Sequence, residues 1–185
     1  MFETIVDPTV GPPASSECDQ PTLAARPDSL FGLRLGLLAN TKRNAEQFLQ
    51  QVGEQLAEQY RLQMVLARKK PNIIETAPEP MMAEFADRCD IVVAGVGDCG
   101  SCSASAVADG LLLEQAGIPA VVICTDAFMA SADAMARLRG APGYRYVTTP
   151  HPVANLTAGG IHDRAVAAIP AIVTLLTQPT MAASA

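Results

Sequence analysis

Residues 90–125 read DIVVAGVGDCGSCSASAVADGLLLEQAGIPAVVICT, and this stretch decides the fold. It opens and closes with short apolar runs rich in Val and Ile, each with the length of a buried strand. Between them, 102–116 is predicted to be helical, and Gly117 suits the left-handed end of a helix. A strand, a helix and a second strand in this order predict two parallel strands joined by a crossover helix.

The same alternation continues on both sides of this unit. Other strands are expected over 33–39, 62–67 and 144–148, and other helices over 45–60, 79–88, 127–138 and 157–176. In the last helix, Pro170 predicts a kink or a break. Together the elements predict an α/β fold, a flavodoxin-like three-layer sandwich with a five-stranded parallel sheet in the order 2-1-3-4-5.

The chain of 185 residues suits one domain flanked by two irregular ends. Residues 1–30 are rich in Pro, Ser, Asp and Thr without a sustained period, so they are predicted to form an extended N-terminal arm. Residues 31–178 are predicted to form a single α/β domain. Residues 179–185 are small and polar enough to form a loose tail.

The composition narrows the class of protein. The apolar fraction is 49%, and the net charge of −6 comes without a basic stripe, which argues against nucleic-acid and anionic-membrane binding. No apolar segment is expected to span a bilayer, and the first residues lack the features of a signal peptide. Five scattered cysteines do not suggest a secreted disulfide framework, so a cytoplasmic location is expected.

In the predicted strand order, the binding crevice lies at the carboxyl ends of the first and third strands. Asn40 and Lys42 follow the first strand, and the turn at 97–102, GDCGSC, follows the third. We therefore expect these two polar loops to face each other. Asn40 and Lys42 would then orient a polar or anionic group of a small-molecule substrate.

Cys99 and Cys102 are the leading catalytic candidates. Their spacing suits redox cycling, in which one thiolate attacks and the other resolves the adduct. The start of the next helix favours a thiolate, most clearly at Cys102. The negative charge of Asp98 opposes a thiolate, so whether the pKa of Cys99 is lowered stays open. Two unreactive buried thiols are the structural alternative. The candidate substrate-binding residues of this turn are Asp98, Gly100, Ser101 and Ser103.

His151 is a third catalytic candidate, just past the fifth strand. Pro150 and Pro152 flank it and stiffen the loop, so His151 could serve as a general acid or base, or simply pack the loop. With His162 as the second histidine and no second cysteine pair, no metal site is predicted. The run GVGD at 95–98 lacks the full dinucleotide pattern, so neither NAD nor FAD is predicted. A flavin would rest on analogy with the fold alone, and no cofactor is predicted.

The motifs resemble the UGSC family, small proteins named for a U-G-S-C motif in which U is selenocysteine and many members carry Cys. The matching stretches span almost the whole chain: 7–9 DPT, 36–42 GLLANTK, 97–102 GDCGSC, 114–119 EQAGIP and 150–152 PHP. The resemblance implies that Cys99 stands at the selenocysteine position and is the attacking nucleophile. The chain departs from selenocysteine-containing members at 104–106, ASA, where larger side chains are expected, so its pocket and substrate could differ.

A more distant similarity is to the selenocysteine-containing substrate subunits of glycine and betaine reductases, which break a carbon–heteroatom bond reductively. The leading hypothesis is a thiol-dependent oxidoreductase in which Cys99 attacks, Cys102 resolves and His151 moves a proton. An external thiol or a protein reductant would restore the dithiol. Two alternatives stay open: non-redox covalent catalysis by Cys99 alone, as a lyase, hydrolase or transferase, and a non-catalytic redox-sensing or binding subunit. Assembly as a homo-oligomer or with a partner subunit is compatible with each of these functions.

Overall fold

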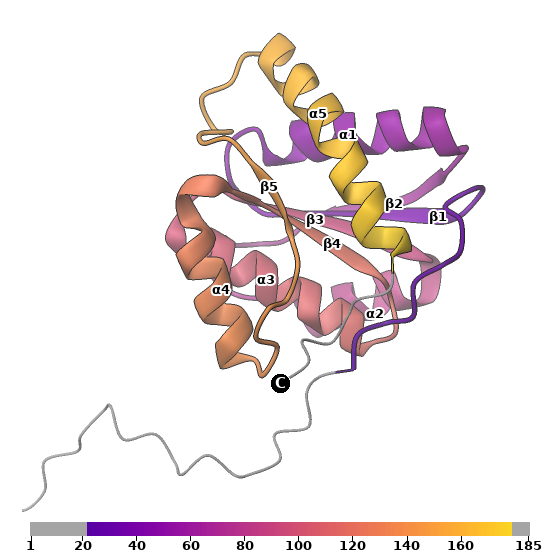
Figure 1. Cartoon of the computed structure of the whole chain (residues 1–185), viewed down its shortest axis with the longest axis horizontal. Coiled ribbons are helices and arrows are strands. Elements are labelled where there is room, and N and C mark those ends of the chain that lie inside the picture. The colour runs from indigo at the N-terminus through magenta and orange to yellow at the C-terminus, as the bar shows by residue number, and fades with distance from the viewer. Residues whose placement is uncertain (1–21, 179–185) are drawn as a thin grey trace, which may run out of the picture.

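The computed structural model describes residues 22–178 (Figure 1), so the tail and most of the predicted arm, including Cys18, lie outside the described residues. Five parallel strands form one sheet in the order β2-β1-β3-β4-β5, which confirms the predicted class and strand order. The strands are β1 (Arg34–Ala39), β2 (Gln63–Lys69), β3 (Ile91–Gly97), β4 (Ala120–Thr125) and β5 (Val147–Thr149).

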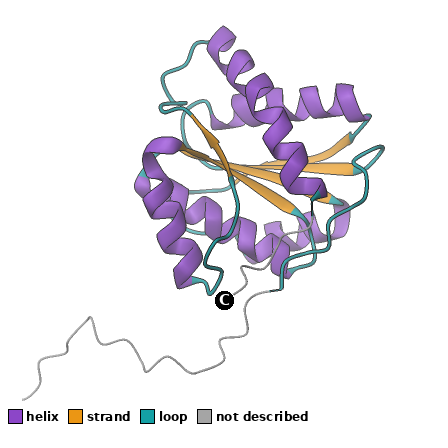
Figure 2. Ribbon diagram, viewed as in Figure 1, coloured by secondary structure: helices purple, strands orange, loops and turns teal. Residues whose placement is uncertain are grey.

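Helices cover both faces of this sheet (Figure 2). One core holds the apolar side chains of α1 and α5, and the other holds those of α2, α3 and α4. The helices are α1 (Ala45–Tyr60), α2 (Glu79–Arg88), α3 (Gly100–Gln115), α4 (Met129–Leu138) and α5 (Ala158–Thr177), with a 3-10 turn at Asp126–Phe128 before α4.

The two cores explain why the central strands are apolar without interruption. Along β1, Leu35 and Leu37 face the core of α1 and α5, whereas Leu38 faces the opposite core. Every residue of β3 is buried. A parallel strand covered on both faces needs apolar side chains at each position, and 90–125 supplies them on two adjacent strands.

Several element boundaries differ from the prediction by one to three residues, and the differences in α3 and β5 are described here together with the course of α5. Helix α3 begins at Gly100, two residues early, because Cys99 itself caps it. Strand β5 begins at Val147, three residues late, so the outermost strand is short. Helix α5 continues through Pro170. The proline leaves the carbonyl of Val166 without its helical partner, and Val166 lies on the solvent side, where water can satisfy that carbonyl.

Helix α5 also changes the expectation about membrane-spanning segments. By length and composition it would be able to cross a bilayer. In the fold it packs against one face of the sheet, with Ile161, Ile169 and Ile172 buried in the core that it shares with α1. Its apolar character therefore has a structural explanation within the domain.

A buried ion pair joins the end of β2 to the middle of α3. Lys70 and Asp109 are 1% and 2% exposed, and their Nζ and Oδ2 atoms lie 2.6 Å apart. Lys70 Nζ also donates to Ser105 Oγ and, at 2.7 Å, to the carbonyl of Glu75. The other carboxylate oxygen of Asp109 accepts the backbone N–H of Ala77. These contacts hold the β2–α2 loop against α3.

We expect Lys70→Met to lower the free energy of unfolding by about 3–5 kcal/mol, because it leaves a buried carboxylate unpaired. Burial already raises the pKa of Asp109 despite the opposing Lys70 charge. Lys69→Met is the matched control. Its partner Glu46 is exposed, so that ion pair should contribute about 0–1 kcal/mol.

Urea unfolding of the two variants measures both values. The double variant Lys70→Met/Asp109→Leu should recover most of the loss, since it removes both charges together. Equal destabilisation by Lys70→Met and Lys69→Met would contradict the assigned role of the buried pair.

Candidate active site

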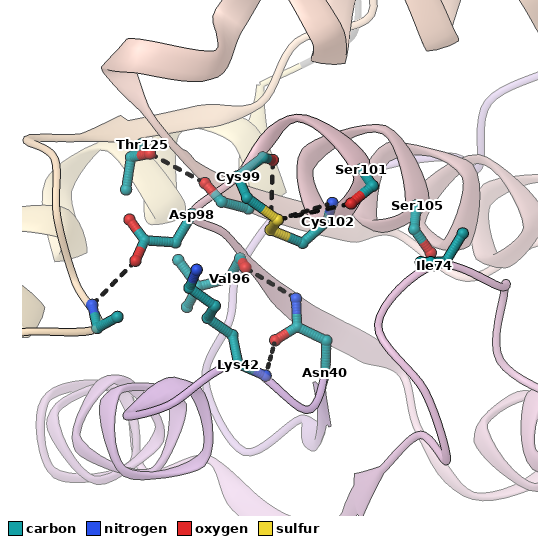
Figure 3. The surroundings of a disulfide bond; sticks show 12 residues. Asn40, Lys42, Ile74, Val96, Asp98, Cys99, Ser101, Cys102, Ser105 and Thr125 are labelled. Atoms are coloured by element: carbon teal, nitrogen blue, oxygen red, sulfur yellow. Dashed lines mark hydrogen bonds between the residues drawn. A yellow bond between two sulfur atoms is a disulfide. The ribbon is translucent and has the colours of Figure 1, made fainter.

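Polar residues singled out in the sequence lie at the carboxyl edge of the sheet, and Figure 3 shows Asn40, Lys42 and Asp98 around the two cysteines. Asn40 follows β1, Asp98 and Cys99 follow β3, and Thr125 ends β4. His151 follows β5, and its Nδ1 lies 2.9 Å from Asp98 Oδ1. Because parallel strands end at one edge, residues 111 positions apart in the chain contribute to one site.

Cys99 and Cys102 form a disulfide, with Cα atoms 5.3 Å apart. This separation lies within the ~7 Å that a disulfide can bridge without backbone movement. Cys99 is half-buried, whereas Cys102 is completely buried. An incoming molecule therefore meets Cys99 first, and Cys102 is placed to react only with Cys99.

The first turn of α3 surrounds the sulfur of Cys99. Its Sγ accepts the backbone N–H of Cys102 at 3.3 Å, and Ser101 Oγ lies 3.7 Å away. Free N–H groups and the positive end of the helix favour a negative charge at this position. The benefit falls on Cys99, the N-cap residue, whereas the sequence suggested it chiefly for Cys102.

Asp98 is buried, and three donors surround its carboxylate. The backbone N–H groups of Val153 and Ala154 donate to it at 3.1 and 2.9 Å, and His151 Nδ1 lies 2.9 Å from Oδ1. These donors offset the negative charge that would otherwise oppose a thiolate at Cys99. Asp98 therefore faces the loop after β5 and lies beside His151.

The contacts of His151 identify its tautomer. Nδ1 lies 2.9 Å from Asp98 Oδ1 and 3.2 Å from Thr125 Oγ1. The Thr125 hydroxyl donates to the carbonyl of Gly97, so it can only accept from the ring. Both neighbours of Nδ1 are acceptors, and Nδ1 therefore carries the proton in the neutral ring.

This tautomer leaves a lone pair on Nε2 of His151. No side chain or backbone group within residues 22–178 bonds to Nε2, and the side chain is 37% exposed. Phe128 packs edge-on against the ring, with the centroids 5.3 Å apart. The ring is thus oriented on one side and open on the other, as a general base or acid requires.

Asn40 is nearly buried and uses both ends of its amide within the protein. Nδ2 donates to the carbonyl of Val96 at 2.8 Å, and Oδ1 accepts the backbone N–H of Lys42 at 3.1 Å. Between Gly95 and Gly97 the register of β3 against β4 shifts. Such an irregularity re-aims nearby groups. Asn40 thus joins the ends of β1 and β3.

Lys42 is half-buried, and Figure 3 shows its side chain extending from the loop after β1 toward the turn that carries Asp98. Gly100 is half-buried and Ser101 is exposed, both in the first turn of α3. These three residues lie where a substrate could reach them. Lys42 supplies a positive charge, and the helix turn supplies free backbone N–H donors.

Ser103 is completely buried beneath the turn. A Cβ on Gly97 would lie 2.6 Å from both Ser103 Oγ and Cys124 Sγ, so glycine at 97 permits the close approach of α3 to β3. Within the described part of the chain, Ser103 Oγ has no hydrogen-bond partner. Ser103 packs under the site and has no path to a substrate in this arrangement.

Sequence reasoning missed three polar residues that build the site. Thr125 contacts the His151 ring, and Asp126 accepts the backbone N–H of His151 at 3.0 Å. Asn44 donates to the loop after β5. The available signal was position, because Thr125 ends a strand and Asn44 and Asp126 lie in the segments that follow strand ends. Across residues 22–178, no group of three or more His, Cys, Asp or Glu side chains is placed to hold a metal ion.

After reduction, we expect iodoacetamide to label Cys99 well before Cys89 or Cys124. Burial raises the pKa of Cys89 to about 11 and that of Cys124 to about 12. At a pH of about 8, a thiol with a pKa of 12 is only about one ten-thousandth thiolate, the form that reacts. Peptide mapping after brief labelling measures the order, and faster labelling of Cys124 would contradict the assignment.

A comparison with curated proteins finds no match. A comparison with family models finds the UGSC family over residues 4–178. That range includes the cysteine turn, Asp98 and the loop of His151, as well as the whole of the described fold. The chain therefore belongs to the UGSC family.

Proposed function

We propose that the protein is a thiol-dependent enzyme that reductively cleaves a bond in a small polar molecule. The observation that carries the proposal is the pairing of a half-buried, helix-capping Cys99 with a completely buried Cys102. One sulfur is accessible and the other can only resolve, which is the arrangement that redox cycling needs. The oriented imidazole of His151 supports it, because the chemistry needs a proton donor nearby.

In the first step, the Cys99 thiolate bonds to an electrophilic carbon or heteroatom of the substrate. The bond from that atom to its leaving group breaks, and the electron pair departs with the group. Nε2 of His151 first takes up a proton from water, and the ring then gives that proton to the leaving group. The result is a covalent adduct on Cys99.

In the second step, the Cys102 thiolate attacks Cys99 Sγ. A disulfide forms, and the bond from Cys99 to the substrate breaks with its electron pair left on the substrate, which takes up a proton. The substrate gains two electrons and two protons in total, and the dithiol becomes a disulfide. An external dithiol, small or on a protein, is oxidised in turn to restore Cys99 and Cys102.

Lys42 and the first turn of α3 suggest the substrate class. A cationic side chain and free backbone N–H groups near Cys99 suit a molecule with an anionic or strongly polar group. Asn40 acts indirectly, by holding the strand ends that carry these residues. A reducing cytoplasmic location fits this cycle, since the buried thiols of Cys89 and Cys124 are both free.

The pairing with Cys102 favours this cycle over covalent catalysis by Cys99 alone. The test is to incubate the reduced protein with small carboxylates that carry a cleavable carbon–heteroatom bond and with small disulfides. Product and the Cys99–Cys102 disulfide should appear in equal amounts. If no compound reacts faster than it does with free dithiothreitol, the proposed enzyme activity is wrong.

A further inference from the structure

Asn44 departs from the usual behaviour of a helix-capping residue in two ways. It is the N-cap of α1, where an Asn side chain normally accepts a backbone N–H of the first turn, but here it makes no such bond. Its backbone is also left-handed, with φ of 67°, where N-cap residues are normally extended. Local rules broken together at one residue often mark a functional constraint.

The side-chain amide of Asn44 instead donates hydrogen bonds to the loop after β5. Nδ2 lies 3.0 Å from the carbonyl of Val153, 3.1 Å from that of Ala154 and 3.0 Å from that of Leu156. Three carbonyl acceptors around one nitrogen require the amide to point its N–H groups at them. The left-handed backbone turns the side chain away from its own helix and toward 153–156.

The same segment is bound on its N–H side by Asp98, which accepts from Val153 and Ala154. Asn44 therefore holds the carbonyls and Asp98 holds the N–H groups of one short stretch of backbone. The Asp98 carboxylate that binds this stretch also binds the His151 ring. A shift of 153–156 would move the carboxylate that orients the imidazole.

We propose that Asn44 is a positioning residue for His151, which links the β1–α1 loop bearing Lys42 to the loop bearing the proton-transfer group. The inference rests on the proposed function, since it assigns Asn44 a part in aligning that site. Lys42 and Asn44 lie two residues apart on one loop. The Asn44 amide thus fixes the position of the Lys42 loop relative to the His151 imidazole.

Asn44→Gly tests the idea because glycine tolerates the left-handed backbone while removing the amide donors. Arg61→Gly is the matched control: Arg61 is also left-handed, with φ of 54°, at the other end of α1 and away from the site. The readout is ¹⁵N NMR of the two histidines near pH 8, where His162 serves as an internal reference.

In the wild type and in Arg61→Gly, the Nδ1–H tautomer of His151 should predominate. In Asn44→Gly, we expect the ratio of the Nδ1–H to the Nε2–H tautomer to fall by roughly tenfold, the effect of weakening the contact between Nδ1 and the Asp98 carboxylate. Asn44→Asp should shift it in the same direction, because a carboxylate would face three carbonyl oxygens. This second variant serves if the glycine variant does not fold.

An unchanged tautomer ratio in a folded Asn44→Gly would overturn the inference and leave Asn44 a structural residue of α1. The proposed function is tested separately by His151→Ala. If Asn44→Gly shifts the tautomer but His151→Ala keeps full turnover, Asn44 positions His151 and the assigned role of His151 in catalysis is wrong.

Discussion

Cys99→Ser is expected to form no covalent adduct and to have no measurable turnover, because an N-cap hydroxyl is far less nucleophilic than a thiolate at neutral pH. Cys102→Ser is expected to form the adduct on Cys99 and stop there. In that variant no neighbouring thiol attacks Cys99 Sγ, so the substrate fragment stays attached when no external thiol is added. Intact-protein mass spectrometry after incubation with a substrate measures both outcomes directly.

Cys124→Ser is the control for general effects of replacing a cysteine, since Cys124 is buried near the same strand end but is assigned no chemistry. It should keep the adduct and the turnover, apart from any loss of stability. Full turnover by Cys102→Ser would show that Cys99 acts alone, without redox cycling. Wild-type activity of Cys99→Ser would remove every version of the mechanism and favour a binding subunit.

His151→Ala is expected to slow turnover by ~10²–10⁴-fold, the range for loss of a general acid or base. Asp98→Asn should act through the same group. An amide at 98 can donate toward the ring, which would favour the tautomer with its proton on Nε2 and remove the lone pair that accepts a proton there. Turnover with a substrate that needs protonation of its leaving group measures both variants.

His162→Ala is the control, because His162 is exposed and its Nδ1 contacts Gln51 rather than any site residue. It should leave turnover unchanged. A substrate with a leaving group that departs without a proton should lose its dependence on His151. If His151→Ala lowers turnover of both substrates by the same factor, the residue shapes the loop and does not transfer a proton.

The strand order could be predicted from the sequence because it depends on local signals. Apolar runs such as 91–97 reveal buried strands by composition alone, and parallel connections allow few topologies. Cys99, Cys102 and His151 could be singled out as candidates for a similar reason, since the two cysteines share a short motif and two prolines flank the histidine. Both kinds of signal are visible within a few neighbouring positions.

The rest depends on contacts between distant segments. Asn44 reads as an ordinary helix cap, and only the three carbonyls more than 100 residues away show its other use. Asp98 reads as a charge that disfavours a thiolate, because its partners Val153 and Ala154 belong to another loop. Ser103 reads as accessible from its place in the motif, yet the close approach of α3 to Gly97 buries it.

Helix α3 is anchored along its length, and this bears on the reaction cycle. Lys70 holds its middle through Asp109, and Arg26 holds its far end through Glu114, where both side chains are almost fully buried. The helix cannot tilt or unwind at low cost, so the oxidised and reduced proteins should share one backbone. If the protein cycles as proposed, reorganisation between its redox states should therefore be confined to two cysteine side chains.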